Sequence, residues 1–157
     1  MKKSSAGLTQ LQLLVRNKHS IVCQAIDASG RVVVVKTPHK KEVHSWSAER
    51  LTNEAAILPH LSAVAGVPLL YDFFWLKTAY GERPILVTEK MPGTTLQEKR
   101  KNTAGYVLPV QECLTLLKRI ATVLTQVHQR GIVHGDLKLG NVLVTATDTV
   151  SIIDWGT

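Results

Sequence analysis

The chain has 157 residues, 45% of them hydrophobic and 20% charged, and carries a net charge of +7 at pH 7. This balance is typical of a globular protein and excludes disordered, collagen-like and membrane-spanning chains. Because the basic residues are scattered and aromatic residues make up only 5%, we expect a solvated basic surface, not a nucleic-acid-binding site. Cys23 and Cys113 lie in apolar runs without a metal-ligand partner, and the first residues are too polar for a signal peptide. We therefore expect a cytoplasmic protein with buried thiols.

The N-terminal part of the chain is predicted to form three strands. Segments 11–15, 21–26 and 31–37 are rich in aliphatic and β-branched residues, and the Asp-Ala-Ser-Gly sequence at 27–30 fits a hairpin turn between the last two. The run Val32–Val35 within the third segment ends on Lys36. On position alone, the ordinary interpretation of Lys36 is a strand-end lysine that extends into solvent.

A helix is predicted from about 45 to 58, with Glu54 in the middle of its apolar stripe. The apolar members of the stripe are Leu51, Ala55 and Leu58. An unpaired buried carboxylate is costly, so Glu54 needs a partner, and Lys36 is the obvious candidate. The alternative is a solvated Glu54 at the edge of the stripe. Glu42 and Glu49 are other carboxylates, but they fall off the stripe.

Two more strands are predicted at 67–76 and 84–91, and Pro-Gly at 92–93 then breaks the pattern. We place a hinge at 89–93. The chain is thereby divided into a first domain, 1–91, with five strands and one helix, and a mostly helical second domain, 92–157.

The second domain begins with a short helix at 94–100, for which Thr94 is the expected N-cap. A long helix is predicted at 109–130, followed by a small hairpin at 142–144 and 150–153. The long helix has two neighbouring apolar stripes. The first is Val110, Leu114, Leu117, Ala121 and Leu124, and the second is Cys113, Leu116, Ile120, Val123 and Val127. Such a helix is expected to pack on two sides.

The segment 131–144 carries a His-Gly-Asp triplet ending in Asp136, followed by Lys138 and Asn141, and Asp154 ends the next apolar run. Three oxygen donors and one lysine in this order suit Mg²⁺ and a phosphoryl group. The alternative for Asp136 and Asn141 is a pair of turn-forming residues that cap a loop.

Taken together, these residues resemble the protein-kinase-like superfamily. Lys36 on a strand, Glu54 on the next helix, a hinge, a long helix, and then HGDLKLGN and DWG occur in the order of that family, over about 11–157. The resemblance implies a two-lobed α+β fold: a five-stranded antiparallel N-lobe sheet with one helix, and an incomplete, mostly helical C-lobe. It also implies an ATP- and Mg²⁺-dependent phosphotransferase, in the first instance a serine/threonine protein kinase with protein substrates.

The resemblance also implies roles for single residues. Lys36 would hold the α- and β-phosphates and be held by Glu54, Asp136 would accept or orient the proton of the attacking hydroxyl, and Lys138 would lie near the γ-phosphate. Asn141 and Asp154 would bind the metal ions. The implied adenine contacts are Val22 and Val34 above the ring, Leu143 below it, Thr88 at the back, and the backbones of Glu89 and Met91. All six would serve equally well as ordinary core residues, and His134 and Trp155 are predicted to be packing residues.

The sequence departs from the family pattern at two motifs. The loop 15–20, Val-Arg-Asn-Lys-His-Ser, has no glycine, although Asn17 and Ser20 tolerate turns and could partly replace it in gripping phosphate. Gly135 stands where regulated kinases carry arginine, so pairing with a phosphorylated activation loop is not expected. With glycine at position 135 the sequence resembles aminoglycoside- and choline-type phosphotransferases and RIO-like kinases. With lysine at position 138 it resembles protein kinases.

The sequence ends at Thr157, just after the DWG triplet. The activation segment and substrate-docking helices of the family are therefore expected to be absent, which would leave the long helix partly open to a partner protein or to self-association. Two alternatives to a protein kinase stay open. One is a small-molecule kinase, and the other is a non-catalytic nucleotide-binding module.

Overall fold

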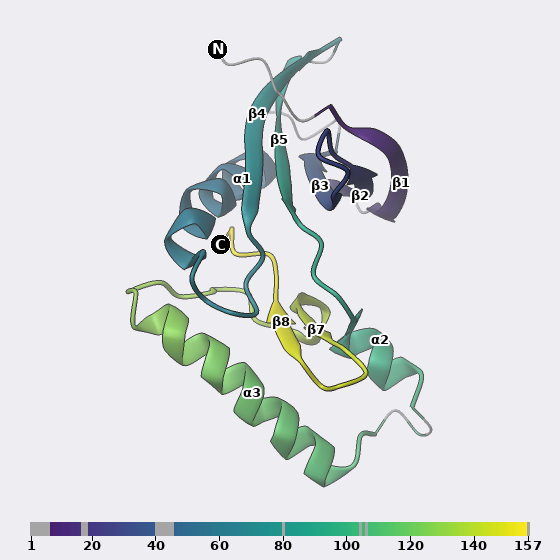
Figure 1. Cartoon of the computed structure of the whole chain (residues 1–157), viewed down its shortest axis with the longest axis vertical. Helices are drawn as coiled ribbons and strands as arrows, with labels where there is room; N and C mark the ends of the chain where they lie inside the picture. The colour runs from purple at the N-terminus through teal and green to yellow at the C-terminus, as the bar shows by residue number, and fades with distance from the viewer. Residues whose placement is uncertain are drawn as a thin grey trace. The chain divides into compact units, whose positions relative to one another are not determined.

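The computed structural model describes residues 7–16, 19–39, 46–79, 81–103, 105 and 107–156 (Figure 1). The chain forms two compact units. The first contains residues 1–59, 69–90 and Gly156, and the second contains 60–68 and 91–155. Each unit is described in turn.

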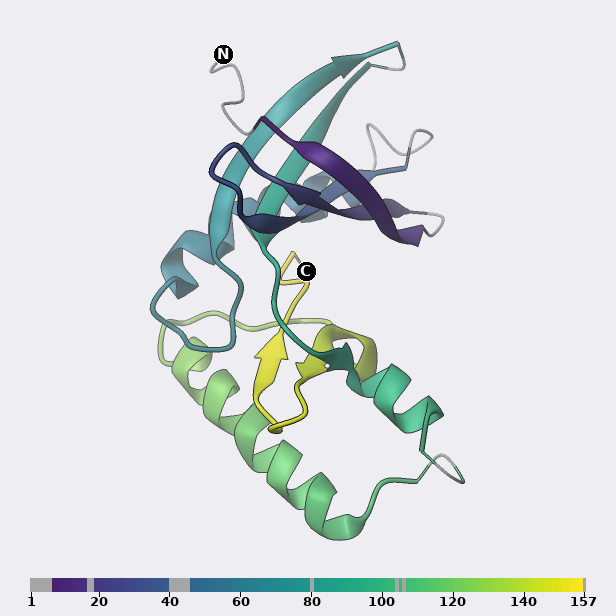
Figure 2. The same cartoon turned by 45° about the vertical axis from the view of Figure 1, so that its right-hand side comes forward.

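The first unit is a five-stranded antiparallel sheet with one helix, which confirms the predicted fold class (Figure 2). The strands are β1 (Thr9–Arg16), β2 (Ser20–Ile26), β3 (Val32–Pro38), β4 (Leu70–Thr78) and β5 (Gly81–Glu89), in the spatial order β1-β2-β3-β5-β4. Helix α1 (Trp46–Ile57) contacts β3 and β5. One face of the sheet carries the core cluster Ala25, Val33, Val35, Ile85 and Val87, against which Leu8, Tyr71 and Phe74 pack.

The turn between β2 and β3 is the predicted hairpin. The backbone N–H of Gly30 donates to the Asp27 carbonyl at 2.9 Å, and Gly30 has a φ of 79°, a conformation that favours glycine. The Asp27 carboxylate accepts from the backbone N–H groups of Ser29 at 2.8 Å and Arg31 at 2.9 Å, and from the Arg31 side chain at 2.7 Å. One carboxylate therefore fixes the whole turn.

Asp27 is expected to make the first unit sensitive to acid. Hydrogen bonding from the Arg31 backbone, above all, holds the pKa of Asp27 below its ordinary value of 3.8, although burial opposes the shift. Since the folded-state pKa is the lower one, this carboxylate stabilises the fold above pH 3.8, and the contribution is lost as the pH falls through the folded-state pKa. Chemical denaturation of the natural chain and Asp27→Asn should show a stability difference that is largest near neutral pH and shrinks below pH 3.8. A pH-independent difference would contradict this prediction.

The second unit is built on helix α3 (Val110–His128) and a three-stranded antiparallel sheet in the order β6-β7-β8. Strands β7 (Val142–Val144) and β8 (Val150–Ile152) are the predicted hairpin, whereas β6 (Thr94–Thr95) was not predicted. Helix α2 (Leu96–Lys101) follows β6, and its Lys99 side chain binds Glu112 of α3 at 2.6 Å and Asp148 of the β7–β8 turn at 3.6 Å. None of the helices in the described ranges is long and apolar enough to cross a membrane.

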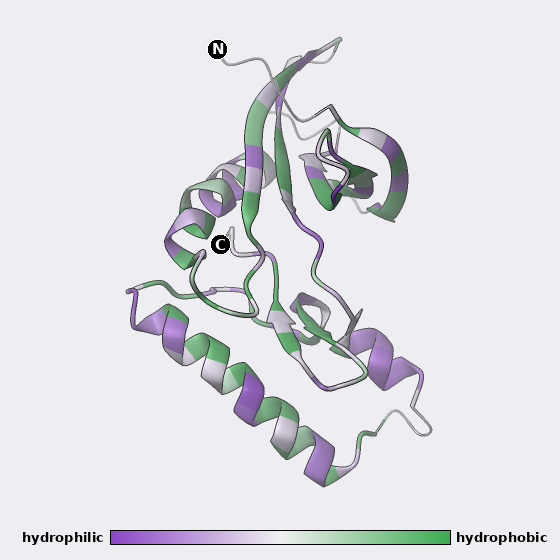
Figure 3. Cartoon of the chain, viewed as in Figure 1, coloured by the Kyte–Doolittle hydropathy of each residue, from purple (hydrophilic) through white to green (hydrophobic). Residues whose placement is uncertain are grey.

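The two apolar stripes of α3 have different surroundings. Leu116, Val123 and Val127 of the second stripe are buried, and α3 contacts β8. In the first stripe, Val110 is 75% exposed and Leu117 is 60% exposed. Figure 3 shows hydrophobic residues recurring between hydrophilic ones along this helix. The structure thus packs one stripe and leaves much of the other open.

The loop 60–68 packs on β8 within the second unit. The Gly66 carbonyl accepts a hydrogen bond from the backbone N–H of Ile152 at 2.7 Å. Gly66 has a φ of 89°, and a Cβ atom at this position would lie 2.7 Å from the Val150 carbonyl oxygen. Glycine is therefore required here by both backbone conformation and close approach.

The expectation of buried thiols is wrong in degree, because Cys23 and Cys113 are both half-buried; both are free thiols. Cys23 pairs with Leu13 of the edge strand β1, and Leu13 is itself 54% exposed. An exposed edge strand leaves its neighbour incompletely covered.

The predicted N-cap of α2 is also wrong, because the cap is Thr95 and not Thr94. Thr94 pairs with Val144 as part of β6. Thr95 and Glu98 form a capping box: the Thr95 hydroxyl accepts from the Glu98 backbone N–H at 3.1 Å, and the Glu98 carboxylate accepts from the Thr95 backbone N–H at 3.0 Å. The sequence offers this spacing twice, as Thr94-x-x-Gln97 and Thr95-x-x-Glu98, and the structure uses the second.

Thr95→Ala should therefore lower the free energy of unfolding by about 1 kcal/mol, the usual effect of losing an N-cap hydroxyl. Urea denaturation measures the loss. Thr94→Ala is the matched control, because it removes the same atoms one residue earlier. Equal losses in the two variants would argue against a dominant cap at Thr95.

Candidate functional site

The strand register brings four of the predicted nucleotide-site residues onto one face of the first sheet. Val22 pairs with Lys36, and Val34 pairs with Thr88. Residues directly opposite each other on antiparallel strands share a face, as do residues two apart on one strand. Val22, Val34, Lys36 and Thr88 therefore form one patch, on the face opposite the core cluster.

Lys36 and Glu54 form the predicted ion pair within the first unit. The Lys36 Nζ and Glu54 Oε1 atoms are 2.7 Å apart, and the two side chains are 9% and 4% exposed. The alternative of a solvated Glu54 is therefore wrong, and so is that of a Lys36 extending into solvent. Helix α1 packs on β3 and β5, so its buried stripe carries the carboxylate to the lysine. Because both side chains are buried, the attraction between the two charges must offset their loss of hydration, and this requires close contact.

The other predicted adenine contacts divide between the two units. The Glu89 backbone N–H donates to the Leu69 carbonyl at 2.8 Å, so a contact of Glu89 with adenine would have to use its carbonyl oxygen. Met91 and Leu143 belong to the second unit, where both are half-buried. The adenine pocket therefore stays a prediction.

In the second unit, Asp136, Lys138 and Asn141 come together in one loop. The Lys138 Nζ lies 2.5 Å from Asp136 Oδ2. The Asn141 amide nitrogen donates to the Asp136 carbonyl at 2.9 Å and lies 3.4 Å from Asp136 Oδ2. Asn141 is only 3% exposed, whereas the Asp136 side chain is 31% exposed. The loop thus presents a half-exposed carboxylate on a buried amide support.

A backbone hydrogen bond connects this loop to the segment that carries Asp154. The Ile153 N–H donates to the Asn141 carbonyl at 3.0 Å. Asp154, the next residue, is half-buried and has a φ of 66°. A non-glycine residue in this conformation costs on the order of 1 kcal/mol and is enriched at functional sites. Asn141 and Asp154 are therefore held in neighbouring segments.

His134 connects the same two segments, a role that was not predicted from the sequence. Its Nδ1 accepts from the Asp136 backbone N–H at 3.2 Å, and its Nε2 lies 2.9 Å from the Ile153 carbonyl oxygen. Only a neutral imidazole with its proton on Nε2 satisfies both bonds. The expected packing role is also present, since the His134 and Trp155 ring centroids are 4.5 Å apart and both residues are buried.

The donor atoms of this arrangement fit a hard divalent cation. Asn141 engages its amide nitrogen with Asp136, which leaves the amide oxygen for a ligand role. Mg²⁺ prefers oxygen donors and needs few from the protein, because phosphates and water complete its shell. Among the residues that the structure describes, no group of three His, Cys, Asp or Glu side chains is placed to hold a metal.

The sequence matches the protein kinase domain family over residues 9–157. The chain belongs to this family. Three serine/threonine-protein kinases illustrate the likeness: PknB of Mycobacterium leprae is 34% identical over 107 residues, kinase C of Synechocystis sp. is 36% identical over 117, and PknA of Nostoc sp. is 32% identical over 117. These matches cover 68%, 73% and 73% of this chain but only 16%, 21% and 20% of the relatives. The chain thus spans about one fifth or less of the length of these kinases.

The glycine-free loop of this kinase-family chain is described only at its ends. Asn17 and Lys18 lie outside the described residues. The His19 carbonyl accepts from the His39 N–H at 2.8 Å, and the His19 and Trp46 rings meet edge to face at 6.0 Å. The end of the loop is thus tied to His39, which follows β3, and to Trp46, the first residue of α1. Its grip on phosphate stays a prediction.

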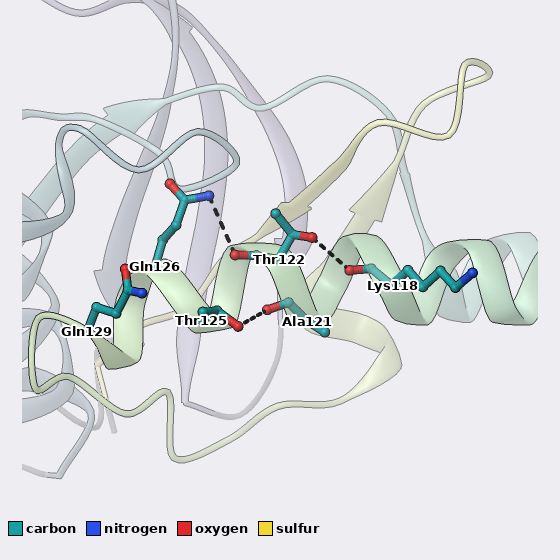
Figure 4. A pocket seen from close by; sticks show the side chains of 6 residues that line it. All are labelled: Lys118, Ala121, Thr122, Thr125, Gln126 and Gln129. Atoms are coloured by element: carbon teal, nitrogen blue, oxygen red, sulfur yellow. Dashed lines mark hydrogen bonds between the residues drawn. The ribbon is translucent and has the colours of Figure 1, made fainter.

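An open depression on α3 is unrelated to these motifs (Figure 4). Its lining comes from the helix and from the residue that caps its C-terminus: Lys118, Ala121, Thr122, Thr125, Gln126 and Gln129. Thr122 and Thr125 donate back to carbonyls four residues earlier, at 3.0 and 2.8 Å. Because both threonine hydroxyls donate to the backbone of the helix, this depression is not a candidate ligand site.

Proposed function

We propose that this protein is an ATP- and Mg²⁺-dependent serine/threonine protein kinase that transfers the γ-phosphate to a hydroxyl group of a protein. The observation that carries the proposal is the set of bonds that fixes Asp136, Asn141 and the Asp154 segment together in the second unit. The serine/threonine-protein kinases among its relatives support the choice of acceptor.

Each proposed role follows from the needs of phosphoryl transfer, which depends on positioning and charge neutralisation. Lys36, held by Glu54, would bind the α- and β-phosphates. Asp136 would orient the attacking hydroxyl and accept its proton, while Lys138 would move from Asp136 to the γ-phosphate. Asn141 and Asp154 would hold Mg²⁺, which neutralises phosphate charge when bound.

A small-molecule kinase is the second candidate, favoured by Gly135. This residue has a φ of 77°, a left-handed conformation in which arginine would be strained. The residue preceding Asp136 therefore provides no cation for a phosphorylated segment.

The proposal also covers location and partners. We place the protein in the cytoplasm, which its free thiols Cys23 and Cys113 support, because disulfides are rare there. The exposed stripe of α3 would be the surface for a partner protein or for self-association.

Transfer of labelled phosphate from ATP in the presence of Mg²⁺ tests the proposal. The natural chain is compared with Asp154→Ala, with and without EDTA, and is offered generic protein acceptors, aminoglycosides and choline. Labelled serine or threonine that disappears in Asp154→Ala would support a protein kinase. Label on the small molecules alone would favour the second candidate. Nucleotide binding without transfer would leave a non-catalytic module and end the catalytic proposal.

A further inference from the structure

Gly156 lies against helix α1 within the first unit, where no side chain fits. A Cβ atom built on Gly156 would lie 2.2 Å from the Arg50 carbonyl oxygen and 2.9 Å from the Arg50 carbonyl carbon. Real Cβ contacts essentially never fall below 3.0 Å. The obstacle is helix backbone, which cannot rotate away as a flexible side chain could. Any residue other than glycine at 156 must displace either its own segment or α1.

The contact is made at the turn of α1 that carries the carboxylate partner of Lys36. The same Cβ would lie 3.3 Å from the Glu54 Cβ atom, and Arg50 and Glu54 are four residues apart on one helix face. The Lys36 Nζ and Glu54 Oε1 atoms are 2.7 Å apart and both side chains are buried. A small movement of the helix would therefore lengthen or break this bond. Apart from this contact with Gly156, α1 packs on β3 and β5.

We infer that Gly156 is a positioning residue for the Lys36–Glu54 pair. Because glycine has no side chain, α1 can occupy the position in which Glu54 contacts Lys36. Gly156 itself is not proposed to touch nucleotide or metal. The inference concerns the geometry of the first unit, and it rests on the proposed function only where it predicts nucleotide use.

The direct test is the chemical reactivity of Lys36 in Gly156→Ala. Reductive methylation followed by mass spectrometry reports how well each lysine is shielded, and it does not require kinase activity. Lys36 should become severalfold more reactive in Gly156→Ala, toward the level of Glu54→Gln. Gly30→Ala is the control for a glycine replaced without a steric obstacle, because its Cβ would meet nothing within 4 Å; unlike Gly156, Gly30 has a positive φ, so any strain in this variant comes from its own backbone. Lys36 should remain shielded in that variant.

A double-mutant comparison separates an effect through Glu54 from general loosening. If Gly156 acts through Glu54, adding Gly156→Ala to Glu54→Gln should not raise Lys36 reactivity further, because interacting sites are non-additive. Additive increases, or an unchanged Lys36 in Gly156→Ala, would overturn the inference. If Gly156→Ala does not fold in buffer, all variants are compared in trimethylamine N-oxide, which favours the folded state.

ATP binding provides the functional readout. Gly156→Ala should weaken ATP affinity more than Gly30→Ala, with a similar loss in Glu54→Gln. Exposure of Lys36 in a chain that neither binds ATP nor transfers phosphate would keep the inference and reject the proposed function. Loss of transfer with Lys36 still shielded would reject the inference alone.

Discussion

Glu54→Gln is expected to lower the free energy of unfolding by about 3–5 kcal/mol, because it removes a carboxylate that is paired with the buried Lys36 ammonium. Lys36 is 7% exposed and Glu54 is 3% exposed, so water cannot compensate for the lost charge. The Nζ–Oε1 distance of 2.7 Å shows that the pair is fully formed. Denaturant titration of the natural chain and the variant measures the difference.

The double variant Lys36→Met/Glu54→Leu is the control for this first prediction. Replacing both members of a buried pair with apolar residues of similar volume is often neutral or stabilising, so the double variant should recover most of the lost stability. It should nevertheless bind ATP poorly, since Lys36 is the proposed phosphate ligand. A double variant less stable than Glu54→Gln would show that the pair contributes more than mutual neutralisation.

Asp136→Asn is expected to slow phosphate transfer by about 10²- to 10⁴-fold, the range usual for loss of a positioned general base. ATP affinity should change little. The Asn141 amide donates to the Asp136 backbone carbonyl at 2.9 Å, so the loop keeps its main support when the carboxylate is replaced. The variant therefore isolates the chemistry of one side chain from the shape of the loop.

Single-turnover transfer and equilibrium ATP binding, measured side by side, check this second prediction. Glu82→Gln is a suitable control, because it removes an exposed carboxylate on β5. A rate within a few-fold of the natural chain would mean that Asp136 is a turn-forming residue. Weak ATP binding in Asp136→Asn would instead point to a distorted loop.

The sequence predicted the elements whose pattern is local and strong. The β-branched run ending at Lys36 and the stripe around Glu54 each have a clear period, and a buried charge demands a partner, so the ion pair could be inferred from two separate segments. The hairpin of β7 and β8 was equally clear from its apolar runs.

Features that depend on distant partners could not be read from periodicity. Strand β6 has only two residues, and it is a strand because it pairs with β7. His134 was predicted to be a packing residue only. Its hydrogen bonds to Asp136 and Ile153 are made with backbone groups, which leave no pattern in the sequence. The N-cap of α2 was ambiguous in the sequence, because Thr94 with Gln97 and Thr95 with Glu98 both have the capping-box spacing.

The hydrogen bond between Gly66 and Ile152 has a consequence for the order of events on the ribosome. The partners of the 60–68 loop in α3 and β8 are made long after the loop itself, with a delay on the order of ten seconds at usual rates of synthesis. Leu61, Val64 and Val67, which are buried in the finished protein, remain uncovered during that time. This loop is therefore a segment of the nascent chain where we expect a chaperone to bind.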